Sequence, residues 1–201
     1  MGILSKLFGG SDAAKDFFNQ GINFYKRGQY EKSANATKEA VRINPNFVEA
    51  YGNLAAAYGL LGRFKESIEA AKEAVRLKPD FIPAYNSLAA AYLALGMNQE
   101  VIDSCNQALR FKHDFAEAYA YLGAAYGNLG FFQEALDAAR QAIRLKPNTV
   151  NAHYILGMAY IALGCYKEAI DAFKEEIRFN PDDIAAKSAL AQAYSIVGFP
   201  Q

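Results

Sequence analysis

Apolar residues recur along the chain with a period of 34 residues, and inside each period they follow the spacing of a helix face. Five similar segments end the periods; they read VRINPN, VRLKPD, LRFKHD, IRLKPN and IRFNPD. Their fifth letters are Pro45, Pro79, His113, Pro147 and Pro181. A repeat of this length predicts equivalent structural units over residues 14–47, 48–81, 82–115, 116–149 and 150–183, with a half unit from residue 184 onward.

The first half of each unit predicts one amphipathic helix. Counting from the first residue of a unit, positions four and eleven carry rings, position seven is leucine in all but the first unit, and position eight is glycine or alanine. In the second unit these residues are Tyr51, Leu54, Ala55 and Tyr58. These positions share one helix face, so they form an apolar stripe with a notch through which another helix can approach. The second half repeats this logic from an aromatic residue such as Phe64 and predicts a second helix.

Glycine and proline mark the expected helix ends. A glycine stands between the two halves of every unit, where it can end a helix in the left-handed conformation at little steric cost. These glycines are Gly28, Gly62, Gly96, Gly130 and Gly164. The proline closes the second helix, because it lacks an amide donor and disfavours a helical conformation in the residue before it. The polar residue after the proline is then expected to cap the next helix; these residues are Asn46, Asp80, Asp114, Asn148 and Asp182.

An aromatic residue, Leu, Gly or Ala, Tyr, small residues and a closing Pro at these spacings resemble the tetratricopeptide repeat (TPR) family over residues 14–198. The resemblance implies an all-α fold, a right-handed α-solenoid in which five helix-turn-helix repeats stack as one continuous domain. The chain departs from the family pattern at Gln20, Asn98, His113 and Glu176.

The two ends lie outside the five repeats. Residues 1–13 are expected to form an N-terminal apolar tail or short helix, and residues 184–201 a C-terminal capping helix. The capping helix should turn one face to the core and the other to water. The core face is predicted to contain Ile184, Leu190, Tyr194 and Val197.

Composition and charge narrow the classes of partner. Hydrophobic residues make up 52% of the chain, which predicts a folded protein. The 21 basic and 21 acidic residues cancel, so there is no net positive charge to attract nucleic acid. Cys105 and Cys165 lie far apart without the spacing of a metal site or a disulfide framework. No run of about 20 apolar residues and no signal peptide is legible, so we expect a cytoplasmic location.

No set of residues predicts catalysis, a metal site or a cofactor site, so we expect a protein that is not an enzyme. His113 and His153 occupy positions that are structural in other units, one in place of a proline and one in place of an aromatic residue.

An arginine recurs in the last turn of each second helix and could form a ladder that reads phosphates. We favour a simpler interpretation, in which each arginine complements the helix dipole and acidic or amide neighbours dilute its charge. The arginines are Arg42, Arg76, Arg110, Arg144 and Arg178.

The resemblance implies that the first helices line a concave groove that receives a peptide or helix from a protein partner. Transferred by position, the expected partner-binding residues of the first three units are Phe18, Ile22, Tyr25, Asn53, Ala56, Asn86, Ala90 and Leu93. Those of the last two units are Tyr121, Ala124, Asn128, Tyr154, Ile155 and Met158. One version of the fold clamps the C-terminal carboxylate of chaperone tails, but only Asn53 fits that clamp here. The other clamp positions hold Phe18, Ile22, Pro83 and Ser87.

The expected groove is nearly uncharged, which favours an apolar or amphipathic segment whose backbone groups the asparagines could bind. In the alternative interpretation, its alanines only raise helix propensity. The leading hypothesis is therefore a protein-interaction scaffold or adaptor, with self-association left open. An RNA-binding helical repeat is a further alternative, against which the neutral charge argues.

The first residues, MGILSKLFGG, support another hypothesis. Residues 1–8 could place Ile3, Leu4, Leu7 and Phe8 on one helix face, ahead of a Gly-Gly hinge. They could anchor a peripheral membrane-associated assembly factor, or pack on the first repeat or on another copy of the chain. A helix this short is marginal in water, so disorder in isolation is the default expectation.

Overall fold

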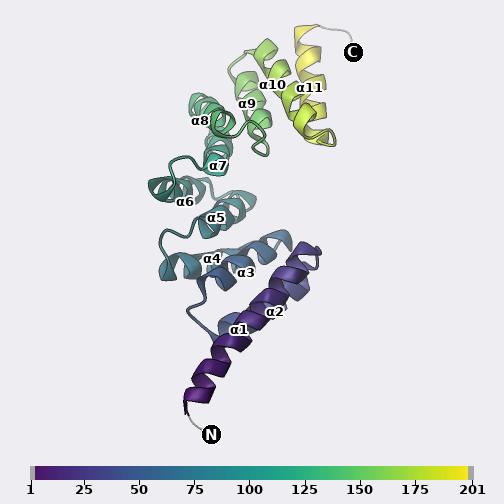
Figure 1. The fold of residues 1–201 in the computed structure, drawn as a ribbon. Coiled ribbons are helices and arrows are strands. Elements are labelled where there is room, and N and C mark those ends of the chain that lie inside the picture. Colours follow the sequence, from purple (N-terminus) through teal and green to yellow (C-terminus); the bar gives the residue numbers. More distant parts are fainter. Residues whose placement is uncertain (1–2, 199–201) are drawn as a thin grey trace. The chain divides into compact units, whose positions relative to one another are not determined.

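A computed structural model describes residues 3–198, with side chains from residue 12 onward, and the helices in this range are joined by short turns (Figure 1). The chain divides into two compact units, Met1–Gly96 and Met97–Gln201, here called unit 1 and unit 2. The division falls in the turn between the two helices of the third predicted repeat. None of the helices within residues 3–198 has the length and apolar character needed to cross a membrane.

Unit 1 contains two helical hairpins and the first helix of the third repeat. Its helices are α1 (Ile3–Lys26), α2 (Tyr30–Ile43), α3 (Val48–Leu60), α4 (Phe64–Leu77) and α5 (Ile82–Ala94). Each helix packs on the next one along the chain, and α3 also packs on α1 and α5. The first helices of successive repeats therefore lie side by side in this unit.

Unit 2 begins with the second helix of the third repeat. Its helices are α6 (Asn98–Phe111), α7 (Ala116–Asn128), α8 (Phe132–Leu145), α9 (Ala152–Ala162), α10 (Tyr166–Phe179) and α11 (Ile184–Val197). Consecutive helices pack on each other, and α9 also packs on α7 and α11. The pattern of unit 1 thus repeats, with α7, α9 and α11 as neighbouring first helices.

The helix ends fall where glycine and proline predicted them. All five turn glycines have positive φ, between 70° at Gly96 and 82° at Gly130. The second helices stop two residues before the proline, and the residue between is extended; Lys78 before Pro79, for example, has φ −143° and ψ 95°. Lys112 adopts the same conformation before His113 (φ −139°, ψ 92°). The break therefore forms without the proline in the third repeat.

The predicted helix caps were wrong. The N-cap of α3, α5 and α7 is the residue after the predicted one, and it is an aromatic residue in each case: Phe47, Phe81 and Phe115. None of these rings can accept a hydrogen bond from the helix, but they fill space. The Phe47 ring lies 4.8 Å from the Phe18 ring, and a Cβ atom on Gly52 would lie 2.6 Å from Phe81 Cε1. The loop aromatic therefore packs on position five of the preceding first helix.

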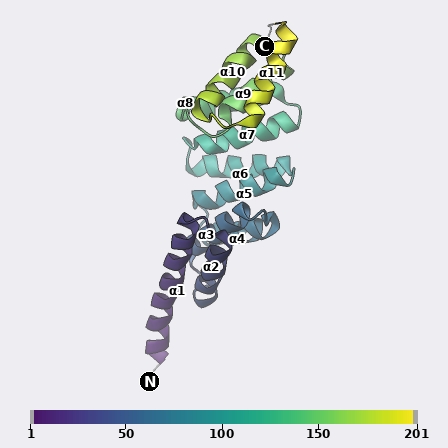
Figure 2. The same ribbon diagram turned by 90° about the vertical axis from the view of Figure 1, so that its right-hand side faces the viewer.

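The N-terminal helix is longer than the repeat requires. α1 runs as one helix from Ile3 to Lys26, so the expected hinge at Gly9 and Gly10 is absent. The helix α2, with which it forms a hairpin, has only 14 residues. The N-terminal part of α1 accordingly extends past the end of α2 (Figures 1 and 2).

The C-terminal helix confirms the predicted packing except at its first residue. Leu190, Tyr194 and Val197 pack on a buried cluster that includes Phe173 and Ala193. Ile184 was predicted to face this core but is 81% exposed. At about 100° per residue, Ile184 lies on the side of α11 opposite to its buried alanines, so it points into water.

Candidate functional site

A surface hollow of about 460 Å³ lies between α7, α8 and α9 in unit 2. Five predicted partner-binding residues line this hollow, and they come from α7 and α9: Ala124, Asn128, Tyr154, Ile155 and Met158. The helices α7 and α9 are the neighbouring first helices of the fourth and fifth repeats. Residues one repeat apart in sequence are thereby brought to one surface.

The hollow exists because small residues occupy its floor. Gly123 and Gly127 of α7 and Ala135 of α8 line it. A Cβ atom on Gly123 would lie 3.0 Å from Ile155 Cγ2 and 3.3 Å from the Ala135 carbonyl oxygen, so α7 and α9 approach closely here. The sequence predicted the notch at Gly123. It did not predict that Phe132 and Ala135 of the second helix would contribute to the lining.

Every residue that lines the hollow is uncharged. Part of the apolar surface is open to water, since Met158 is 43% exposed and Phe132 is 37% exposed. When a partner covers apolar surface of this kind, the complex is stabilised by about 25 cal/mol per Å² of surface removed from water. The hollow is therefore suited to an apolar side chain of a guest and not to a charged one.

The wall residue Tyr154 is fixed by two contacts. Its ring lies 5.9 Å from the ring of Phe173, which is fully buried. Its backbone N–H donates to Glu176 Oε2 at 3.2 Å. Tyr154 is the third residue of α9, where a helix amide has no partner within the helix. Glu176 of α10 thus supplies the missing acceptor.

The need for Glu176 follows from an unusual start of α9. The helices α3, α5 and α7 begin at position one of their repeats, whereas α9 begins two residues later, at Ala152. Its N-cap Asn151 is left-handed, with φ 61°, and its side chain makes no capping hydrogen bond. Glu176 is only 4% exposed. The equivalent residues of the other repeats are alanines: Ala40, Ala74, Ala108 and Ala142. The departure of Glu176 from the repeat was the sequence signal for this contact.

His153 has the structural role that the sequence predicted. Its Nε2 lies 2.9 Å from the carbonyl oxygen of Pro147, and its ring stacks on Phe179 at 5.5 Å. Tyr85 occupies the same position in the third repeat and donates its hydroxyl to Pro79 O at 2.8 Å. Histidine therefore substitutes for tyrosine in a contact that ties the first helix to the preceding turn.

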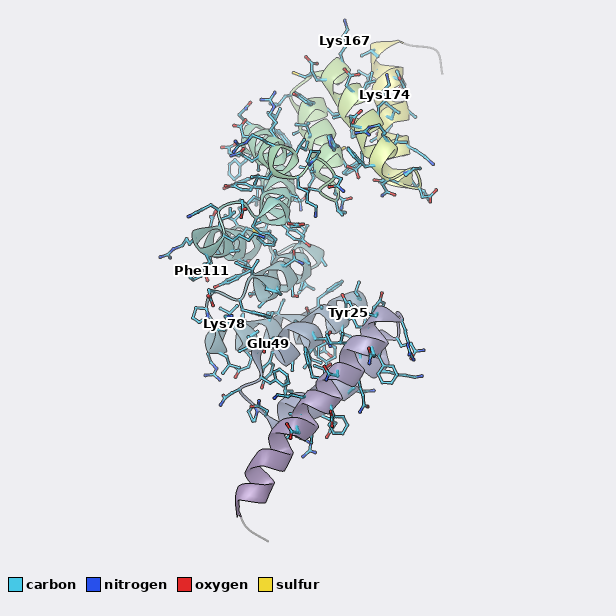
Figure 3. All side chains as sticks on the ribbon, viewed as in Figure 1. Tyr25, Glu49, Lys78, Phe111, Lys167 and Lys174 are labelled. Carbon is cyan, nitrogen blue, oxygen red and sulfur yellow. The ribbon has the colours of Figure 1, made fainter. Side chains whose placement is uncertain are left out.

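The predicted residues of unit 1 take part mainly in the fold. Phe18 packs on Phe47, and Tyr25, near the C-terminal end of α1, makes an edge contact with Tyr30 at 5.4 Å (Figure 3). Ile22 is half-buried on the same helix. The remaining half-buried candidates of this unit lie on α3 and α5: Ala56, Asn86, Ala90 and Leu93.

Asn53 is held inside unit 1. Its Nδ2 donates to Thr37 Oγ1 at 2.7 Å and to Ser33 Oγ at 3.3 Å, and both acceptor residues are fully buried. The Asn53 nitrogen is therefore used inside the fold, contrary to the expectation that this amide is available to a partner.

Tyr121 of unit 2 is a predicted partner-binding residue that does not line the hollow. Burial raises the pKa of its hydroxyl.

Four of the five recurring arginines bond to a neighbour on the same helix, which agrees with the prediction that acidic or amide neighbours dilute their charge. Arg42, Arg76 and Arg178 each bind the glutamate three residues earlier, with N to O distances of 2.8 Å, 2.5 Å and 2.8 Å. Arg144 Nε donates to the Gln141 side chain at 2.7 Å. Their charge is thus shared with neighbours on the same helix.

Comparisons with known proteins agree with this architecture. Sequence models described as tetratricopeptide repeat match residues 121–184 and 48–81, and one described as TPR repeat matches residues 21–62. No curated protein sequence matched the chain.

Solved structures show the same fold. The crystal structure of MamA is 26% identical, covers 85% of this chain and 93% of its own, and has a TM-score of 0.71. A thermophilic TPR protein from Thermus thermophilus is 23% identical, with coverage of 91% and 100% and a TM-score of 0.73. YrrB, described as a TPR protein with an unusual peptide-binding site, is 18% identical, with coverage of 86% and 89% and a TM-score of 0.66. The chain belongs to the tetratricopeptide repeat family.

Proposed function

We propose that this protein is a scaffold that binds an apolar or amphipathic segment of a protein partner, and that the hollow between α7 and α9 receives an apolar side chain of that segment. The TPR fold supports a general role in protein interaction. The finer assignment depends on one observation. The hollow is lined by uncharged residues and leaves Met158 and Phe132 partly exposed.

Helix-in-groove recognition fits this chemistry. An amphipathic helix binds by placing apolar residues, spaced three or four positions apart, into an apolar groove. Met158 has an unbranched thioether that can adapt to guests of different shape. A charged anchor would lose its hydration without gaining a partner in the hollow, so we expect little dependence of affinity on salt.

Charge placed in the hollow tests the proposal. Met158→Glu should abolish recovery of partners from extracts of the source cell, while the circular dichroism of the chain stays unchanged. Leu163→Glu is the matched control, because Leu163 is an apolar residue with 41% exposure that directly follows α9 and lies outside the hollow. Recovery of the same partners by both variants would show that the hollow is not the binding site.

The other sequence predictions stay open. A membrane anchor in residues 1–8 concerns side chains outside the described ones, although the backbone of α1 is helical from Ile3. Equal sedimentation of the full chain and of residues 11–201 with liposomes would eliminate this anchor. The cytoplasmic location and the lack of RNA binding likewise remain predictions.

A further inference from the structure

We infer that residues 3–8, at the start of α1, bind in the hollow between α7 and α9 of a second copy of this chain, so that copies associate head to tail. This assignment rests on the proposed function and deepens it, because it names the partner segment. Three features carry it: the residue pattern of the segment, the direction in which α1 leaves unit 1, and the opposite net charges of the two units.

Residues 3–8 have the chemistry that the hollow is proposed to accept. They read ILSKLF, and their backbone is helical. At about 100° per residue, the four large apolar residues share one side of the helix: Ile3, Leu4, Leu7 and Phe8. Lys6, the only charged residue before Asp12, is placed outside that side. An apolar helix side with residues three and four positions apart is the ligand class of an apolar groove.

α1 presents this segment outside its own hairpin. The helix runs from Ile3 to Lys26 without a break, whereas its partner α2 has only 14 residues. The N-terminal part of α1 therefore extends past the end of α2 (Figures 1 and 2). Because the helix continues through Gly9 and Gly10, the segment cannot fold back onto the hairpin without breaking α1.

The geometry of unit 1 favours the hollow of another copy. α3 packs on both α1 and α5, and the N-terminal end of α1 lies at the opposite end of unit 1 from α5 (Figures 1 and 2). The chain leaves unit 1 through the turn at residues 95–97, which directly follows α5. The segment thus points away from the end at which the chain continues into unit 2. A second copy can receive it while α1 stays straight.

The neutral total charge is divided unequally between the two units. Unit 1 contains 12 basic and 9 acidic residues, whereas unit 2 contains 9 basic and 12 acidic residues. Contact between unit 1 of one copy and unit 2 of the next brings opposite net charges together. Contact between two copies of the same unit brings like charges together, which is unfavourable. The charge division therefore favours head-to-tail association over a symmetric dimer.

A lipid surface suits the segment less well than the hollow does. Helices that lie on membranes combine an apolar face with a polar face rich in lysine and arginine. Lys6 is the only basic residue before Lys15, so the segment lacks such a face. The hollow, in contrast, is lined by uncharged residues and requires no basic partner.

Head-to-tail contact uses a different surface on each copy, so two variants of the full chain can complement each other. Leu7→Glu places a charge in the segment and leaves the hollow intact, and Met158→Glu does the reverse. Each variant, their equimolar mixture and the wild type are compared by sedimentation velocity over a range of concentrations. Leu163→Glu is the control, because Leu163 belongs neither to the segment nor to the hollow.

We expect the average mass of the wild type and of Leu163→Glu to rise above the monomer mass of 22.0 kDa as concentration increases. Leu7→Glu and Met158→Glu should each stay at the monomer mass. Their mixture should form a one-to-one dimer and no larger species, because the segment left free in that dimer and the hollow left free in it are both blocked. Formation of this dimer also shows that both variants are folded.

Three results would overturn the inference: a wild type that stays monomeric at its highest soluble concentration, self-association of either variant like the wild type, or a mixture that stays monomeric. Binding of a monomeric wild type, but not of Leu7→Glu, to anionic liposomes would assign the segment to a membrane instead. If the wild type is monomeric and Met158→Glu still loses its partners from extracts, the inference fails and the proposed function stands.

Discussion

Replacing Gly157 by alanine should destabilise unit 2, although the same change inside a helix is usually stabilising. Gly157 lies in α9, at the position where the repeat carries glycine or alanine. A Cβ atom there would lie 2.5 Å from Phe173 Cε1, 2.7 Å from Cδ1 and 2.8 Å from Cζ. Ordinary carbon contacts are about 3.5–4.0 Å. Phe173 is fully buried in the cluster with Ala169 and Ala193, so its ring has no open space to move into.

Two opposing terms set the magnitude. Alanine is more favourable than glycine in a helix interior by about 1 kcal/mol. Inserting a carbon into a packed core costs about 1–3 kcal/mol, and the upper end applies because three ring atoms are affected. The net effect should be a loss of about 2 kcal/mol in the free energy of unfolding.

Urea denaturation followed by far-ultraviolet circular dichroism measures this loss. Gly127→Ala is the control in the same unit, since its Cβ would meet only Ala135 Cβ, at an ordinary 3.9 Å. Gly127→Ala should be stabilised by up to about 1 kcal/mol. The reasoning is refuted if Gly157→Ala unfolds at the wild-type urea concentration or above it. As a further check, Phe173→Leu should cost less in the Gly157→Ala background than alone, because the two positions share one space.

Three other predictions concern single side chains. Glu176→Ala should destabilise unit 2 by about 1–2 kcal/mol in urea and Glu176→Gln by less, because glutamine retains an acceptor for the Tyr154 amide. Cys105 should resist iodoacetamide in the folded chain while the more exposed Cys165 reacts, as seen by mass spectrometry, because burial raises the pKa of the Cys105 thiol to about 12. The pKa of Glu117 is lowered: burial is the largest single cause and raises it, but the hydrogen bond from Lys146, a backbone hydrogen bond and the charges of Lys146 and Lys112 together lower it more. Its contribution to stability is therefore present above the ordinary value of 4.5 and is lost as the pH falls through the folded value, so wild type should lose more stability than Glu117→Gln between neutral and acidic pH.

The periodicity and its breakers were sufficient to predict the helices. Gly130 requires no partner to adopt φ 82°, and Pro79 restricts Lys78 through sterics alone. Such effects act within one or two residues and can be read from a single sequence. The late start of α9 at Ala152 could not be read in this way, because it is compensated by Glu176, which lies on the following helix.

Contacts between repeats were less accessible to sequence reasoning. Position five of the first helix was expected on the open groove in the first unit, where it is Phe18, and in the fifth, where it is Tyr154. In the structure Phe18 packs on the loop residue Phe47. Tyr154, by contrast, does line the hollow. The loop before α9 carries Thr149 in place of an aromatic residue, and its hydroxyl bonds locally to Lys146 O at 2.7 Å. Whether the side chain at position five is open to a partner thus depends on whether the neighbouring loop carries an aromatic residue that packs on it.

One position of the repeat shows how the same backbone arrangement gives a closed contact or an open one. Asn53 and Ile155 are both position six, and each approaches the glycine at position eight of the preceding first helix, Gly21 or Gly123. In unit 1 the second helix presents the hydroxyl of Thr37, and Asn53 is committed to it. In unit 2 the second helix presents alanines, so Ile155 makes van der Waals contact and remains part of the hollow's wall. A polar residue at this position is therefore available to a partner only where the preceding repeat offers it no hydrogen bond. Asn53 was the one residue that matched a carboxylate clamp, and its use inside the fold is a further argument against binding of chaperone tails.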